Sequence, residues 1–212
     1  MTTEIINNRE EIQKFTICIS GAAEVSHCGP DVVAKAYELG AAISKAGFQL
    51  ATGATTGFPY YVNQGFKKIG GFAFGLSPAA TKKEHTEIYK LPTDYVDAMI
   101  YTGFGFPGRD MMLVRSSDAI IIGCGRIGTI HEFTIGWESD IPVGVLEGPW
   151  GTDEVIKTII KNSNRTNPKV IFDTDPARLV EKLKEMLLTC GNDCQKPFTA
   201  VPPSYHTDEV RG

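Results

Sequence analysis

The chain has 212 residues, and its 21 Lys and Arg residues against 25 Asp and Glu residues give a formal net charge of −4. Hydrophobic residues make up 42% of the sequence, which is typical of a globular protein and excludes disorder throughout the chain. The acidic balance provides no basic surface for duplex nucleic acid, and no window approaches the ~20 apolar residues of a membrane span. The polar N-terminus lacks a signal-peptide core, so we expect a cytoplasmic protein.

Seven short apolar runs, separated by longer stretches of helical periodicity, predict strands. In chain order they are Phe15–Ser20, Phe48–Thr52, Phe72–Leu76, Ala98–Tyr101, Ala119–Gly123, Val143–Leu146 and Val170–Asp173. The fifth run reads Ala-Ile-Ile-Ile-Gly. Strands that are apolar almost throughout are typical of parallel sheets, because helices cover both faces of such sheets.

The stretches between these runs predict six helices, at 30–45, 58–69, 108–117, 129–139, 152–162 and 176–188. In the first of them, Pro30 suits the first helical position and Gly47 suits a C-terminal stop. Strands that alternate with helices predict a Rossmann-like, doubly wound α/β fold with a mostly parallel sheet of about seven strands. We expect one domain over residues 1–190 and an extended or disordered tail over 191–212.

Three segments rich in small residues follow predicted strands, where open α/β sheets bind their ligands. The glycines lie at Gly21 after the first strand, at Gly53 and Gly57 after the second, and at Gly123, Gly125 and Gly128 after the fifth. Glycine lets backbone N–H groups approach an anion, and a helix N-terminus adds free donors. None of the segments is a Walker loop. Residues 123–128 match G-x-G-x-x-G by letters, but after a late strand, so the match is weak evidence for a dinucleotide site.

The region around the last of these segments carries the most specific signal. Residues 109–112 read Arg-Asp-Met-Met, residues 117–119 read Ser-Asp-Ala, and Gly-Cys-Gly-Arg-Ile-Gly-Thr-Ile-His-Glu follows the strand at 123–132. This stretch resembles the Lonely Guy (LOG) family of nucleotide phosphoribohydrolases, within a superfamily that also contains molybdenum cofactor carriers. The resemblance extends more loosely over residues 15–148.

The resemblance implies a function and a set of site residues. Arg109 and Glu132 fall on the catalytic arginine and glutamate, and Gly125, Gly128 and Thr129 fall on the phosphate loop. We expect Arg126 and Ile127 of that loop to bind the nucleotide as well. The implied reaction is hydrolysis of the N-glycosidic bond of an AMP-like nucleoside 5′-monophosphate.

In this reaction Glu132 would stabilise the oxocarbenium-like state or activate water, while Arg109 would hold Glu132 ionised and contact the substrate. No metal or redox cofactor is required for it. The family also implies a homodimer or a higher homo-oligomer.

Three departures from the family pattern leave the activity open. Cys124 replaces a proline, Arg126 replaces a glycine and Asp110 replaces a lysine. The Arg126 side chain either adds a phosphate ligand or crowds the pocket. The alternative function is therefore a carrier or sensor that binds a nucleotide or the molybdenum cofactor without catalysis, and a scaffold with a vestigial pocket is a third reading.

Simpler structural roles compete with these assignments. Thr129 and Glu132 have the spacing of a capping box, which would open a helix at Thr129. We expect Cys124 to be a small turn residue rather than a nucleophile, and Cys18 to be a core residue. Cys190 and Cys194 lack further ligands at matching spacing, so no metal site is predicted.

Overall fold

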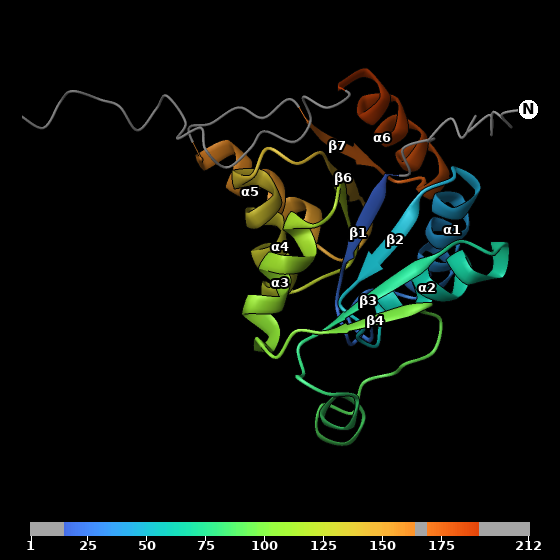
Figure 1. The fold of residues 1–212 in the computed structure, drawn as a ribbon. Helices are drawn as coiled ribbons and strands as arrows, with labels where there is room; N and C mark the ends of the chain where they lie inside the picture. The colour runs from blue at the N-terminus through green and yellow to red at the C-terminus, as the bar shows by residue number, and fades with distance from the viewer. Residues whose placement is uncertain (1–14, 164–168, 191–212) are drawn as a thin grey trace, which may run out of the picture.

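The computed structural model describes residues 15–163 and 169–190, which form a seven-stranded sheet with helices on both faces (Figure 1). The strand order is β4-β3-β2-β1-β5-β6-β7, and every neighbouring pair is parallel. The strands are β1 (Thr16–Ser20), β2 (Gln49–Thr52), β3 (Ala73–Ser77), β4 (Ala98–Tyr101), β5 (Ala119–Ile122), β6 (Val143–Leu146) and β7 (Val170–Asp173). The predicted Rossmann-like α/β fold is confirmed, and each strand lies within one residue of its predicted bounds.

The helices are α1 (Val32–Lys45), α2 (Phe58–Ile69), α3 (Gly105–Arg115), α4 (Ile127–Glu138), α5 (Thr152–Asn162) and α6 (Pro176–Cys190). Helices α1, α2 and α6 cover one face of the sheet, and α3, α4 and α5 cover the other (Figure 1). Each face holds its own apolar cluster. Ile17 and Ile19 belong to one cluster and Cys18 to the other, since successive side chains of a strand point to opposite faces.

Several local expectations differ from the structure. Helix α1 begins at Val32 with Asp31 as its N-cap, so Pro30 precedes the helix and is not its first residue. Helix α3 begins at Gly105, three residues before the predicted start.

A short π-helical turn, Glu84–Ile88, lies between β3 and β4, where the sequence predicts no helix. Helix α4 begins at Ile127 with Arg126 as its N-cap, two residues before the predicted start. Thr129 is therefore the third helical residue, and the capping box expected at Thr129 and Glu132 is wrong.

The sheet places the C-terminal ends of β1 and β5 side by side. The chain adds strands on one side of β1 as far as β4 and then returns to place β5 on the other side. The Ala22 N–H donates a hydrogen bond of 2.7 Å to the Cys124 carbonyl, which joins the turns that follow the two strands. Open α/β sheets bind ligands at such a reversal of strand order.

Two expectations concern the chain as a whole. No helix among the described residues is long and apolar enough to cross a membrane. The predicted tail, 191–212, lies outside the described residues.

Close packing of α1 on α2 generates a stability prediction. A Cβ at Gly40 would overlap the Val62 carbonyl of α2, whereas a Cβ at Gly128 would meet no atom within 4 Å. We expect Gly40→Ala to lower the free energy of unfolding by about 1–3 kcal/mol, because overpacking forces the helices apart. Gly128→Ala, the matched control, should keep or raise stability, since alanine is the better helix former. Denaturant unfolding measures both variants, and equal stabilities would contradict this packing.

Candidate functional site

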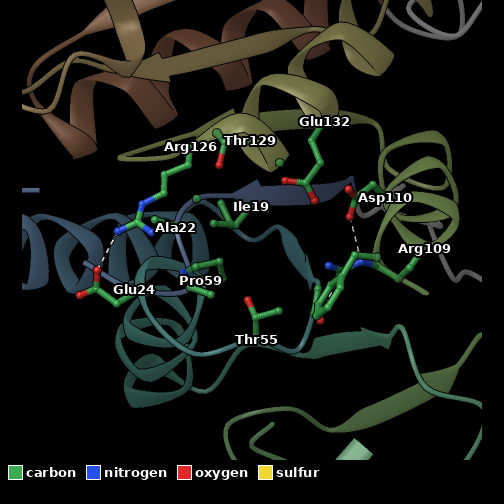
Figure 2. Close-up of a pocket in the computed structure, with 15 residues that line it drawn as sticks. Ile19, Ala22, Glu24, Thr55, Pro59, Arg109, Asp110, Arg126, Thr129 and Glu132 are labelled. Atoms are coloured by element: carbon green, nitrogen blue, oxygen red, sulfur yellow. Dashed lines mark hydrogen bonds and ion pairs between the residues drawn. The ribbon is translucent and has the colours of Figure 1, made fainter. Parts of the chain in front are cut away.

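A cavity of about 290 Å³ opens at this reversal, between the turns after β1, β2 and β5 and the start of α4 (Figure 2). Apolar and charged side chains line it together. The lining residues are Ile19, Gly21, Ala22, Ala23, Glu24, Gly53, Thr55, Pro59, Phe106, Arg109, Asp110, Arg126, Gly128, Thr129 and Glu132.

The cavity collects most of the residues that the sequence analysis singled out, but not all of them. Those that line it are Gly21, Gly53, Arg109, Arg126, Gly128, Thr129 and Glu132. Those that do not are Gly57, Gly123, Gly125 and Ile127. The second group shapes the surrounding turns, as the contacts of its glycines show.

Gly123 and Gly125 make room for neighbouring side chains. A Cβ at Gly123 would overlap the ring of Phe58, and one at Gly125 would overlap the side chain of Thr129. The Gly125 N–H also donates a hydrogen bond of 2.8 Å to Oγ1 of Thr152. The Gly125 N–H therefore already has a hydrogen-bond acceptor within the protein, contrary to the expectation that it binds a phosphate.

The N-terminus of α4 supplies donors that the helix itself leaves free. The first helical hydrogen bond runs from the Ile130 N–H to the Arg126 carbonyl, at 3.1 Å. The N–H groups of Ile127, Gly128 and Thr129 thus precede any intrahelical acceptor. Gly128 and Thr129 face the cavity, so the positive end of the helix dipole opens into it. This is the arrangement that binds anions at helix N-termini.

Arg109 of α3 is buried, with 4% of its surface exposed, and it is bound to the backbone. Its Nη1 donates to the Gly53 carbonyl and, at 3.1 Å, to the Leu76 carbonyl, at the ends of β2 and β3. Its Nε donates to Asp110 at 3.1 Å, and the guanidinium lies 5.8 Å from the ring centroid of Phe106. The side chain therefore holds α3 against the sheet while it lines the cavity.

Asp110 bridges Arg109 to a histidine. It is 6% exposed, and its second oxygen lies 3.1 Å from Nδ1 of His131, on α4. The residue that departs from the family's lysine thus supplies a buried negative charge beside Glu132. From the sequence, Asp110 is only a departure from the family pattern, and this role is not predicted.

Glu132 points into the cavity from α4, toward the side of Asp110 (Figure 2). The Ser20 hydroxyl, at the end of β1, donates a hydrogen bond to its carboxyl group. Burial, followed by the charge of Asp110, raises the pKa of Glu132 to about 7, although Ser20 and Arg109 act in the opposite direction. Arg109 thus lowers the pKa of Glu132 as expected, but burial and Asp110 outweigh its effect.

Arg126 spans the mouth of the cavity and pairs with Glu24 from the turn after β1, at 2.8 Å (Figure 2). Both side chains are more than half exposed. An exposed ion pair of this kind contributes little stability, about 0–1 kcal/mol. Arg126 can therefore exchange its contact with Glu24 for a bound anion with little loss of stability.

Cys124 forms a disulfide with Cys28, whose Cα lies 5.8 Å away. Cys124 lies in the turn between β5 and α4, as expected, but its disulfide was not predicted from the sequence. The bond joins the segment between β1 and α1 to the turn between β5 and α4, and both segments line the cavity. Cys18 is a buried free thiol, as expected.

These features define a Rossmann-like α/β protein with a candidate anion site where the strand order reverses. The chain belongs to the SLOG cluster4 family, which matches residues 14–180. The resemblance to the superfamily of LOG proteins and molybdenum cofactor carriers is therefore confirmed.

Relatives and solved structures agree with this assignment. An uncharacterized protein of Archaeoglobus fulgidus is 32% identical over 133 residues, which are 63% of this chain and 80% of that protein. The molybdenum cofactor binding protein of Rippkaea orientalis is 28% identical with a TM-score of 0.68, over 83% of this chain and 99% of that one. The molybdenum cofactor carrier protein of Chlamydomonas reinhardtii is 25% identical with a TM-score of 0.66, over the same shares.

Ser20 and Glu24 were not predicted from the sequence as parts of the site, whereas Thr55 lies within the glycine-rich segment 53–57 that was. Ser20 is the last residue of a predicted strand beside Gly21, and this position was a usable signal. Glu24 lies in a turn where only the pairing of distant strands shows what it faces, and no local pattern identifies it.

The raised pKa of Glu132 predicts a dependence of stability on pH. A carboxyl group whose pKa rises from 4.5 in the unfolded chain to about 7 in the fold favours folding fully below pH 4.5 and loses this contribution as the pH rises through 7. Glu132→Gln keeps the shape without titrating. We expect the stability of the variant relative to wild type to increase between pH 4.5 and 7, by on the order of 3 kcal/mol, and then to level off.

Denaturant unfolding at a series of pH values measures this difference. A constant difference between the two proteins from pH 4.5 to 8 would contradict the raised pKa of Glu132.

Proposed function

We propose that this protein binds the phosphate monoester of a small heterocyclic compound, a nucleoside 5′-monophosphate or a pterin-type cofactor, for carriage or sensing. The observation that carries the proposal is the start of α4, where Gly128 and Thr129 present N–H groups to the cavity beside the exposed cation of Arg126. Two of the similar solved structures are a binding protein and a carrier protein for the molybdenum cofactor, a phosphorylated pterin, which supports this class of ligand.

The rest of the cavity suits the remainder of such a ligand. Its volume lies near the lower limit for small-molecule sites. Ala22, Pro59 and Phe106 offer apolar surface to a ring, and Thr55 offers a hydroxyl group. The phosphate would contact α4, and the heterocycle would lie toward these apolar side chains.

Hydrolysis of an N-glycosidic bond is the second candidate, and Glu132 favours it. A carboxyl group with a pKa near 7 on the cavity wall suits general acid–base catalysis at neutral pH. Glu132 would take a proton from the water that attacks the anomeric carbon, while the bond to the base breaks and the base leaves with the electron pair. This candidate ranks second because Arg109, the other implied catalytic residue, is bound to Gly53, Leu76 and Asp110.

The homodimer, the cytoplasmic location and the lack of any required metal or redox cofactor stay predictions. An apolar surface beside the cavity is consistent with a second subunit. Phe106 and Met111 of α3 and Ile127 of α4 are 45%, 50% and 83% exposed.

Gly128 provides the test of the phosphate position. An aspartate there has open space and sits at a helix N-terminus that favours negative charge, so Gly128→Asp should fold. We expect it to weaken binding of nucleoside monophosphates at least tenfold, and to leave binding of the matching nucleosides within about twofold, because it repels only the phosphate. Titration calorimetry measures both, and Gly128→Ala controls for the added side chain. Equal losses for the two ligand classes would refute the phosphate assignment.

Glu132→Gln separates carriage from hydrolysis. Wild type and variant are incubated with purine and pyrimidine monophosphates, and free base is followed by chromatography. Under the proposed carriage function, wild type binds monophosphates and releases no base. Release of base by wild type that falls on the order of 10²–10⁴-fold in Glu132→Gln would instead establish the hydrolase.

A further inference from the structure

Three potential metal ligands meet behind the mouth of the cavity, in a place that the proposed function does not use. They are Sγ of Cys28, Sγ of Cys124 and a ring nitrogen of His27, and all ligand atoms lie within 4.8 Å of one another. The two cysteines are buried, whereas His27 is partly exposed. Because Cys28 and Cys124 lie 96 residues apart, only the pairing of β1 with β5 brings this set together.

The distances from the histidine suit one shared ion. Nε2 of His27 lies 3.7 Å from Sγ of Cys28 and 3.6 Å from Sγ of Cys124. Metal bonds of about 2.0–2.1 Å to nitrogen and 2.3 Å to sulfur, at a tetrahedral angle, separate the two ligand atoms by about 3.6 Å. Nδ1 lies only slightly farther from Sγ of Cys28, at 4.0 Å. The distances of Nε2 suit a shared ion once the two sulfurs, joined in the disulfide, separate and the ring turns toward them.

The second ring nitrogen of His27 faces polar partners. Nδ1 lies 3.8 Å from a carboxylate oxygen of Glu24 and 3.1 Å from the Arg126 guanidinium. A histidine ligand commonly places its second nitrogen against a carboxylate, which fixes the ring and raises its basicity. The guanidinium can only donate, so its contact uses the lone pair of Nδ1 and leaves the ring proton on Nε2. Binding of a cation at Nε2 moves that proton to Nδ1, so Arg126 has to turn away and Glu24 has to approach to accept it.

We propose that the reduced protein binds one thiophilic cation, Zn²⁺ or Cu⁺, through Cys28, Cys124 and His27. A cellular dithiol supplies two electrons and two protons, which cleave the disulfide to two thiols, and the dithiol becomes a disulfide. Each thiol then loses its proton as its sulfur binds the cation. Thiolate and imidazole ligands are the set that these ions prefer.

The cation and the disulfide exclude each other, since both use the same two sulfurs. Either one ties the segment after β1 to the turn after β5. The inference is independent of the proposed function, because it rests on ligand atoms outside the phosphate position at α4.

The experiment measures Zn²⁺ binding to the reduced and the oxidised chain. A background variant, Cys190→Ser/Cys194→Ser, removes the other cysteines except Cys18, whose thiol pKa is raised well above its usual value by burial. The protein is reduced with a phosphine, freed of reductant without oxygen, and titrated with Zn²⁺ against a chromophoric chelator. We expect one equivalent bound by the reduced chain and none by the chain with the disulfide.

Variants assign the ligands. Cys28→Ser/Cys124→Ser should abolish binding. His27→Ala should weaken it at least about a hundredfold, since losing even an outer-sphere partner of a ligand typically costs 10–100-fold. His27→Ala also keeps the two buried cysteines, so it tests the site without disturbing the core. His131→Ala is the matched control and should bind as the background does.

Substitution with Co²⁺ provides a second readout. Cobalt bound to thiolate gives a charge-transfer absorption that the double cysteine variant should lack. The proposal is overturned if the reduced background binds Zn²⁺ no more tightly than the double cysteine variant. It is also overturned if His27→Ala binds as the background does, or if the oxidised chain binds equally well.

Discussion

The parallel pairing of β1 with β5 is the contact on which the rest of the structure depends. The two strands lie far apart in the sequence, and their register sets Ser20 beside Ile122. This pairing brings the Ser20 hydroxyl to Glu132, and it brings Cys28 to Cys124. A shift of the register would separate the carboxyl group from its hydrogen-bond donor and the two sulfurs from each other. The cavity, its buried acid and the disulfide are therefore consequences of one non-local contact.

The protonation of Glu132 depends on the other buried charges beside the cavity. One cation, Arg109, lies among two carboxyl groups, those of Asp110 and Glu132, and Asp110 holds its Nε. A second carboxylate is costly in this environment, so burial and the charge of Asp110 raise the pKa of Glu132 to about 7, and its protonated form becomes populated near neutral pH. A neutral Glu132 also repels a bound phosphate less than an ionised one would. The raised pKa of Glu132 is thus compatible with an anionic ligand in the cavity.

The sequence predicted the sheet well and the site only in part. Seven apolar runs identified all seven strands, because strands buried on both faces leave a strong local pattern. The start of α4 was misplaced, since Arg126 rather than Thr129 ends the preceding turn. The disulfide and the role of Glu24 were missed for another reason. Both depend on which distant turns the sheet brings together, and no spacing within the sequence encodes that.

Two contacts of unequal strength join the segments at the mouth of the cavity. The pair of Arg126 with Glu24 is exposed, screened by salt and easily exchanged for a ligand. The bond between Cys28 and Cys124 is covalent and buried. The disulfide, or a cation in its place, therefore sets the distance between the two segments, while Arg126 remains free to change partner. His27 contacts Arg126 through Nδ1 and Cys124 through Nε2. A change in the bonding of the sulfurs can therefore alter the position of Arg126 through this one side chain.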